Sequence, residues 1–234
     1  YTLDGSDPRY SANAITATSP VSITIDPNSA QGGRGQTGGV ILRASKFEAG
    51  LAPSKPVTRS YIFFKKIKTQ THPGGSWPTT NVNGQILDFA VNNYIPSENR
   101  YKYYIDDALL DIPTISISTD LDNLFSSSTG IYVNAQYHGS AWERPANVEL
   151  IHPNGSQGFN IDAGIRIRGG WSRHDNYPKH AFRLFFSAEY GETKLRFPLF
   201  DAEGVAEFDK IDLRTSQNYS WANGGSQSTY NTMN

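Results

Sequence analysis

The sequence predicts a mainly β protein with short helices, an α+β arrangement. Only 37% of its 234 residues are hydrophobic, whereas aromatic residues reach 12%. The 21 glycines and 13 prolines should place turns close together along the chain. Short runs that alternate apolar and polar residues recur, as in strands with one buried face. These features favour a loop-rich β protein over a helical bundle.

The charge and the composition exclude some classes of function. The formal net charge of −1 argues against a general nucleic-acid binder, which needs a basic surface. The sequence has no polybasic run and no apolar stretch long enough to cross a membrane. Because cysteine is absent, disulfides and thiolate metal sites are excluded. The abundance of Asn, Ser, Thr and Tyr favours a secreted or cell-surface location.

The first unit, residues 1–64, should consist of strands and turns. Its opening, YTLDGSDP, predicts a short strand that turns at Asp4-Gly5. Further strands are expected at 20–25, 40–47 and 57–64. The glycine-rich segment 31–39 predicts an exposed, mobile loop, and it lacks the lysine-serine ending and following helix of a P-loop.

Residues 65–112 form a connector. Its first part is polar and broken by glycine and proline, so it should run over the surface. Apolar spacing predicts two helical turns at 86–94. Asp106 and Asp107 could bind a cation, but solvated acids near the start of a short helix are the favoured interpretation.

The second unit, residues 113–234, begins with the alternating strand 113–119, which places Ile115 and Ile117 on one face. Thr119 or Asp120 is the expected N-cap of a single helical turn. The segment SSSTGIY should then return the chain to a strand, and Asn154-Gly155 should form a turn. Later strands are expected in WERPANVELIHPNG before that turn, in NIDAGIRIRGG, in HAFRLFFSAEYG and in KIDLRTSQNYSW.

The segment Gly164–Phe186 predicts a hairpin that carries an unusual number of positive charges. In GIRIR, Ile165 and Ile167 share one face, which leaves the arginines on the other. The arginine fork suits either carboxylate or phosphate. Consecutive glycines also allow backbone N–H groups to approach an anion closely. A phosphate site would use Gly169, Gly170, Ser172, Lys179, Arg166, Arg168 and Arg173.

The alternative for this hairpin is a solvated face whose arginines pair with acids on neighbouring strands. Glu143, Glu149 and Asp162 could also be a glycosidase carboxylate pair, but structural ion pairs are the favoured interpretation. None of the five histidines shows a metal-binding spacing, so no metal site is assigned. These histidines are His72, His138, His152, His174 and His180.

Exposed aromatic side chains could instead stack on sugar rings. Of Trp77, Trp142, Trp171 and Trp221, Trp77 is expected to be the least constrained by packing, because it lies in the connector. A surface polysaccharide is therefore a possible partner.

Residues 1–64 resemble the small immunoglobulin-like module found at the C-terminus of chitobiase and β-hexosaminidase enzymes. The resemblance rests on YTLDGSDP, on ILRASKFEAGLAPSKPVTRSYIF and on the spacing between them. It implies a non-catalytic accessory β-sandwich whose first strand or two are missing here.

Residues from about 112 to 234 resemble the CotH, or spore-coat-type, family of atypical kinases, which also occurs in large secreted bacterial proteins. The motifs are PTISISTDLDNLFSSSTGIYVN, WERPANVELIHPNG, FNIDAGIRIRGGWSRHDNYPKHAFRLFFSAEYG, LRFPLF and IDLRTSQNYSW. The resemblance implies a β-rich N-terminal kinase lobe in which a glycine-containing hairpin covers the phosphates of ATP.

On this resemblance Lys179 is the ATP-phosphate lysine, Gly169, Gly170 and Ser172 form the covering loop, and the three hairpin arginines support it. ATP with Mg²⁺ and a protein substrate are implied. The family's metal-binding and catalytic aspartates lie further along than IDLRTSQNYSW. No catalytic residue is therefore assigned, and this part is expected to be inactive alone. The alternative is a non-catalytic extracellular module that binds carbohydrate or protein and keeps only a kinase-like shape.

Overall fold

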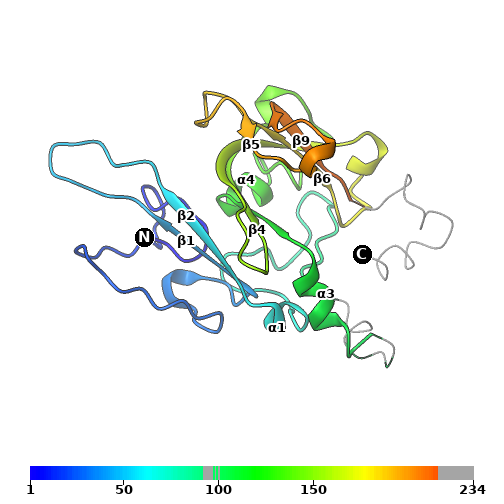
Figure 1. Cartoon of the computed structure of the whole chain (residues 1–234), viewed down its shortest axis with the longest axis horizontal. Coiled ribbons are helices and arrows are strands. Elements are labelled where there is room, and N and C mark those ends of the chain that lie inside the picture. The colour runs from blue at the N-terminus through cyan, green and yellow to red at the C-terminus, as the bar shows by residue number, and fades with distance from the viewer. Residues whose placement is uncertain (92–96, 98, 100, 216–234) are drawn as a thin grey trace.

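The computed structural model describes residues 1–91, 97, 99 and 101–215. As predicted, the chain is mainly β with a few short helices. Its largest element is a five-stranded antiparallel sheet in the order β3-β4-β5-β6-β9 (Figure 1). The strands of this sheet are β3 (Thr114–Ser118), β4 (Arg144–Ile151), β5 (Asn160–Arg168), β6 (Ala181–Phe185) and β9 (Lys210–Leu213).

Short elements surround this sheet. The α-helices described are α1 (Phe64–Ile67), α3 (Ile105–Asp111) and α4 (Leu121–Phe125). The 3₁₀ turns are η1 (Gln31–Gly33), η2 (Ser140–Trp142), η3 (Trp171–Arg173) and η4 (Asp201–Glu203). Two-stranded antiparallel sheets are formed by β1 (Gly39–Ala44) with β2 (Val57–Ile62), and by β7 (Leu195–Arg196) with β8 (Glu207–Phe208). In the described ranges, no helix is long and apolar enough to span a bilayer.

One face of the large sheet carries the hydrophobic core. The alternation of β5 places Ile161, Ala163, Ile165 and Ile167 in that core, as its sequence predicts. Burial of each aliphatic side chain contributes about 1.5–3 kcal/mol to the stability of the fold. This face therefore holds the β5–β6 hairpin firmly in the sheet. The other buried members are Ile131, Ala135, Ala146, Val148, Leu184, Phe186 and Leu195.

The segment 1–64 is built round the β1–β2 pair. The opening of the chain follows β1 through single bridges from Thr2 to Arg43 and from Asp4 to Ile41. Gly5 has φ +83°, and the Asp4 carboxylate accepts from Ser6 N–H at 3.0 Å, so the predicted turn forms here.

Two expectations for this segment are wrong. Residues 20–25 form no strand, because their backbone pairs with no neighbouring strand. The loop 31–39 is not simply exposed: Arg34 is only 3% exposed and donates to four backbone carbonyls. The loop therefore folds round a buried guanidinium, a contact that glycine content does not reveal. The four acceptors belong to Pro27, Ser29, Thr37 and Gly39.

Strand β2 docks on the large sheet through polar contacts. The buried Glu149 carboxylate accepts from Ser60 N–H at 2.8 Å and pairs with Arg59 at 3.2 Å. The hydroxyls of Ser60 and Ser116 lie 2.8 Å apart, and Asn160 donates to the Thr58 carbonyl at 2.8 Å. These bonds fix the N-terminal segment against β3, β4 and β5.

The connector differs from its prediction. Residues 86–91 are not helical, and residues 92–94 of the expected helix lie outside the described part. Phe89 packs edge-on against Trp77, with ring centroids 5.1 Å apart, and both contact Phe125 of α4. Trp77 is therefore held in an aromatic cluster, and the expectation that it is the least constrained tryptophan is wrong. Asp106 lies in the first turn of α3 and pairs with Lys68 at 2.5 Å, so it is a structural acid.

Two local predictions near α4 also change. Asp120 occupies the N-cap position but makes no capping bond, because its carboxylate accepts from Asp7 N–H at 2.8 Å. The segment SSSTGIY forms turns rather than a strand, and Asn134 donates to three of its carbonyls. The turn at Asn154-Gly155 forms as expected, with Gly155 at φ +75°.

Candidate functional site

The charged loop joins β5 to β6 at one end of the large sheet. Arg168 faces Ala181 in the last pair of the ladder, and the loop runs from Gly169 to His180. Gly169 has φ +127°, and a β-carbon there would lie 1.9 Å from the Ser172 hydroxyl. A β-carbon on Gly170 would meet nothing within 4 Å. Gly169 is thus required by the loop's own packing, whereas Gly170 leaves open space beside the backbone.

Arg166 is engaged in an ion pair with Glu143, which precedes β4. Its Nε donates to Glu143 Oε2 at 2.5 Å, and its guanidinium lies 4.2 Å from the centre of the Phe185 ring. Tyr190 donates to the other oxygen of the same carboxylate at 2.8 Å. Burial and this hydrogen bond both raise the pKa of Tyr190. Glu143 is therefore a structural acid, which confirms the ion-pair interpretation for this residue. Glu149 pairs with Arg59, whereas Asp162 accepts from Asn147 and forms no ion pair among the described residues.

Arg168 shares a carboxylate with Arg183 of β6. Asp212 of β9 accepts from Arg168 Nε at 2.7 Å and from Arg183 Nε at 2.5 Å. The hydrogen bond from Arg183 is the main cause that lowers the pKa of Asp212 to about 2, with Arg168 adding to it against burial. Asp212 therefore stays ionised and ties three strands together.

Arg173 holds the loop in place through hydrogen bonds to backbone carbonyls. Its guanidinium donates to the carbonyls of Gly169 at 2.6 Å, Ala135 at 2.9 Å and Tyr137 at 2.9 Å, and also to that of Ile167. Burial lowers the pKa of Arg173, and the nearby Arg168 charge adds to this. The group closes the loop onto residues 135–137 without meeting a described carboxylate.

Lys179 lies at the end of the loop with its side chain exposed. The residues on either side of it are held by one group, the hydroxyl of Tyr132. This hydroxyl donates to the Pro178 carbonyl at 2.6 Å and accepts from His180 N–H at 3.2 Å. The backbone of Lys179 therefore has a fixed direction.

The buried side chains of Gln85 and His180 contact each other and hold the backbone at the end of the loop in place. Gln85 is 1% exposed, and its amide nitrogen donates to the carbonyls of Ile86 and Tyr177. This orientation turns its oxygen towards His180 Nε2 at 2.6 Å, while His180 Nδ1 faces the Ser172 carbonyl at 2.9 Å. Burial is the main cause that lowers the pKa of His180, although the Ser172 carbonyl partly opposes it.

The structure thus divides the seven predicted residues. Gly169, Gly170, Ser172, Arg173 and Lys179 lie in one loop, and Arg166 and Arg168 lie on β5. The three arginines already bind acids or carbonyls of the protein. Sequence reasoning missed Tyr132, Gln85 and Asp212, which position the loop from distant parts of the chain. The apolar setting of IYVN and the alternation of KIDLR are signals that Tyr132 and Asp212 lie near the core.

Comparisons of the chain with models of protein families, with curated proteins and with solved structures found no match. These comparisons therefore support no function for the loop.

Proposed function

We propose that the β5–β6 loop is the phosphate-binding part of an ATP site in a CotH-type atypical protein kinase. The observation that carries this proposal is the placement of Lys179: exposed, close to Gly169 and Gly170 in sequence, and fixed on both sides by Tyr132. The resemblance of residues 112–234 to that family supports it, as does the five-stranded antiparallel sheet that carries the loop.

The chemistry assigned to the loop is electrostatic. An ammonium group provides a mobile point charge for the β- and γ-phosphates, as lysines of phosphoryl-transfer enzymes do. The open side of Gly170 allows a phosphate to approach the backbone. Because the three arginines hold the hairpin together, their proposed role is to support the loop and its positive potential rather than to contact phosphate.

No transfer step is assigned to the described residues. Among them, no three acidic or histidine side chains come together to hold a metal ion, so Mg²⁺ is given no ligand here. The wider proposal includes phosphorylation of a protein hydroxyl by the whole protein, a secreted or cell-surface location, and an immunoglobulin-like accessory module at residues 1–64. The β1–β2 pair is compatible with that module.

Titration of the chain with ATP in the presence of Mg²⁺ tests the proposal. We expect saturable binding that Lys179→Ala weakens about tenfold or more, since one charge-assisted contact to phosphate is lost. Lys65→Ala, which removes an exposed lysine of α1, should bind as the wild type does. Equal affinity of both variants, or no binding by the wild type, would contradict the proposal.

The second candidate is a non-catalytic extracellular recognition module with a kinase-like shape. The ion pairs of Arg166 and Arg168 favour this candidate. Because these two charges are neutralised by acids of the protein, the hairpin attracts phosphate less strongly than its sequence suggests. Absence of ATP binding by the folded chain, with and without Mg²⁺, would support this candidate.

A further inference from the structure

A cavity of about 370 Å³ lies between the N-terminal segment and the large sheet, away from the β5–β6 loop. Its walls come from the N-terminal segment, from Arg43 of β1, from Lys55 before β2, from β4 and β5, from the start of α4 and the residues before it, and from the segment after β6. A volume of this size is within the range of small-ligand sites. Residues 169–180 contribute nothing to its lining, so it is separate from the proposed ATP site.

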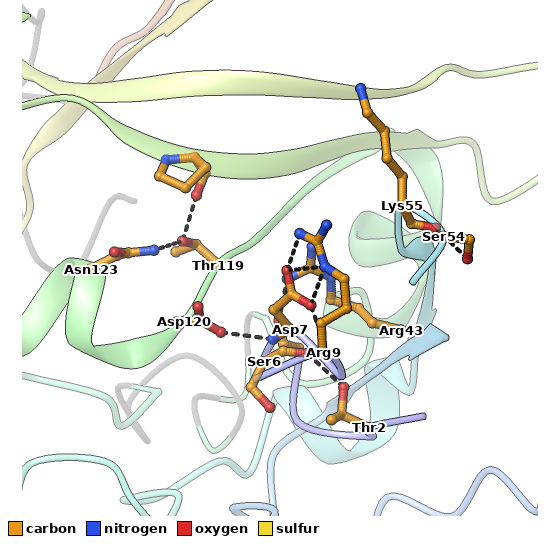
Figure 2. Close-up of polar contacts among 12 residues, drawn as sticks. Thr2, Ser6, Asp7, Arg9, Arg43, Ser54, Lys55, Thr119, Asp120 and Asn123 are labelled. Carbon is orange, nitrogen blue, oxygen red and sulfur yellow. Dashed lines mark hydrogen bonds and ion pairs between the residues drawn. The ribbon is translucent and has the colours of Figure 1, made fainter. Parts of the chain in front are cut away.

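An ion pair gives the cavity a fixed wall. The Arg9 guanidinium donates to the Asp7 carboxylate from Nη2 to Oδ2 at 2.7 Å and from Nε to Oδ1 at 3.0 Å. Asp7 is only 8% exposed. Although burial raises the pKa of Asp7, hydrogen bonds from Arg9 outweigh it and lower the pKa. Figure 2 shows this pair between Asp120, which accepts from Asp7 N–H, and Arg43. The wall is therefore preorganised.

Charged groups of both signs remain available round this wall. Within the described ranges, Lys55 forms no ion pair and lines the cavity. Arg43 also lines it and donates from Nη1 to the Gly5 carbonyl at 3.2 Å, which leaves its Nη2 without a described partner, whereas its Nε is buried and inaccessible. The same cavity is lined by Asp162, which accepts from Asn147 at 3.0 Å, and by the exposed Glu189. The cavity thus offers both donors and acceptors that have spare capacity.

This balance decides between classes of ligand. A phosphate or another polyanion would meet Asp162 and Glu189, whereas a simple cation would meet Arg43 and Lys55. An apolar ligand would remove these groups from water without giving them hydrogen bonds. A hydroxyl group both donates and accepts, so a ring that carries several hydroxyls can satisfy both signs.

An aromatic ring is available at the rim. Tyr10 is 81% exposed, and the Arg9 guanidinium lies 5.2 Å from the centre of its ring. This contact holds a large ring in water beside the polar wall, where a sugar can pack its C–H groups. We propose that the cavity binds a neutral, hydroxyl-rich saccharide, with Lys55 and Arg43 donating to its oxygens and Asp162 accepting from its hydroxyls.

Calorimetric titration of the chain with cellobiose and with N,N′-diacetylchitobiose tests the proposal. We expect saturable binding of at least one disaccharide. Lys55→Ala and Asp162→Asn should each weaken it about tenfold. The matched controls Lys65→Ala and Asp107→Asn change exposed residues outside the cavity and should leave the affinity unchanged.

Three results would overturn the proposal: no binding of either disaccharide by the folded chain, equal loss in the cavity variants and the controls, or binding of inorganic phosphate or glycylglycine in place of both sugars. Circular dichroism of each variant checks that it is folded. Lys179→Ala should bind sugar as the wild type does, so failure of the ATP proposal and failure of this one are distinguishable.

Discussion

The hydroxyl of Tyr132 donates to the backbone carbonyl of Pro178 at 2.6 Å, although the two residues are 46 positions apart. The same hydroxyl accepts from His180 N–H, so one side chain fixes the peptide units on both sides of Lys179. Burial raises the pKa of Tyr132, which keeps this hydroxyl protonated and able to donate. The backbone direction at Lys179 is therefore set by Tyr132.

Tyr132→Phe should loosen Lys179 while preserving the aromatic packing. Loss of the two hydrogen bonds should cost about 1–3 kcal/mol of unfolding free energy, because two backbone groups lose a partner. If Lys179 binds phosphate, ATP affinity should fall several-fold because the lysine must then be ordered on binding. Denaturant melts and ATP titration measure the two effects. Unchanged stability would show that the hydroxyl does not hold the loop.

Gly164→Ala should destabilise the sheet. A β-carbon at position 164 would lie 2.3 Å from Glu143 Oε1 and 2.6 Å from the Tyr190 ring, so the Arg166–Glu143–Tyr190 network would have to move. Overpacking of this kind costs about 1–3 kcal/mol. Urea denaturation measures it. Gly39→Ala in β1 is the control, since its nearest new contact is at 4.0 Å. Equal melts of both variants would contradict the expectation.

The sequence predicts β5 and β6 well because their alternation matches a sheet with one buried face. The buried pattern of Ile165 and Ile167 follows from period two alone. The same signal at residues 20–25 fails because alternation describes a strand but does not supply a partner for it. An alternating pattern therefore predicts a strand correctly only where a neighbouring strand is present to pair with it.

The candidate site is less predictable than the strands. Residue types correctly indicate that the hairpin arginines suit carboxylates, but they do not reveal that Asp212 takes Arg168 while Glu143 takes Arg166. Those choices depend on strand register, which is set by the whole sheet. The position of Trp77 is also not predictable from its own segment, since its partners Phe89 and Phe125 come from elsewhere in the chain.

Asp212→Asn should alter the acid stability of the protein. The pKa of Asp212 is lowered to about 2 from 3.8, so its contribution to stability is present above pH 3.8 and is lost as the pH falls towards 2. The variant should be less stable at pH 7 and should lose less stability than the wild type between pH 4 and pH 2. Denaturant melts across this range measure it. Asp209→Asn, an exposed acid in contact with Lys194 at 3.4 Å, is the control. Parallel pH profiles of the wild type and Asp212→Asn would contradict the assignment.

His180 should titrate below its ordinary value. Burial disfavours the imidazolium and lowers the pKa from 6.5, and the charge of Arg173 adds to this, while the Ser172 carbonyl and the charge of Asp175 oppose it. Because the unfolded chain then binds a proton more readily, the stabilising effect of His180 is present above pH 6.5 and declines as the pH falls through and below that value. Titration of the His180 ring by NMR measures its pKa directly. A value above 6.5 would contradict the expectation and would mean that the acceptors Gln85 Oε1 and Ser172 O, which both face ring nitrogens, outweigh the burial of the ring.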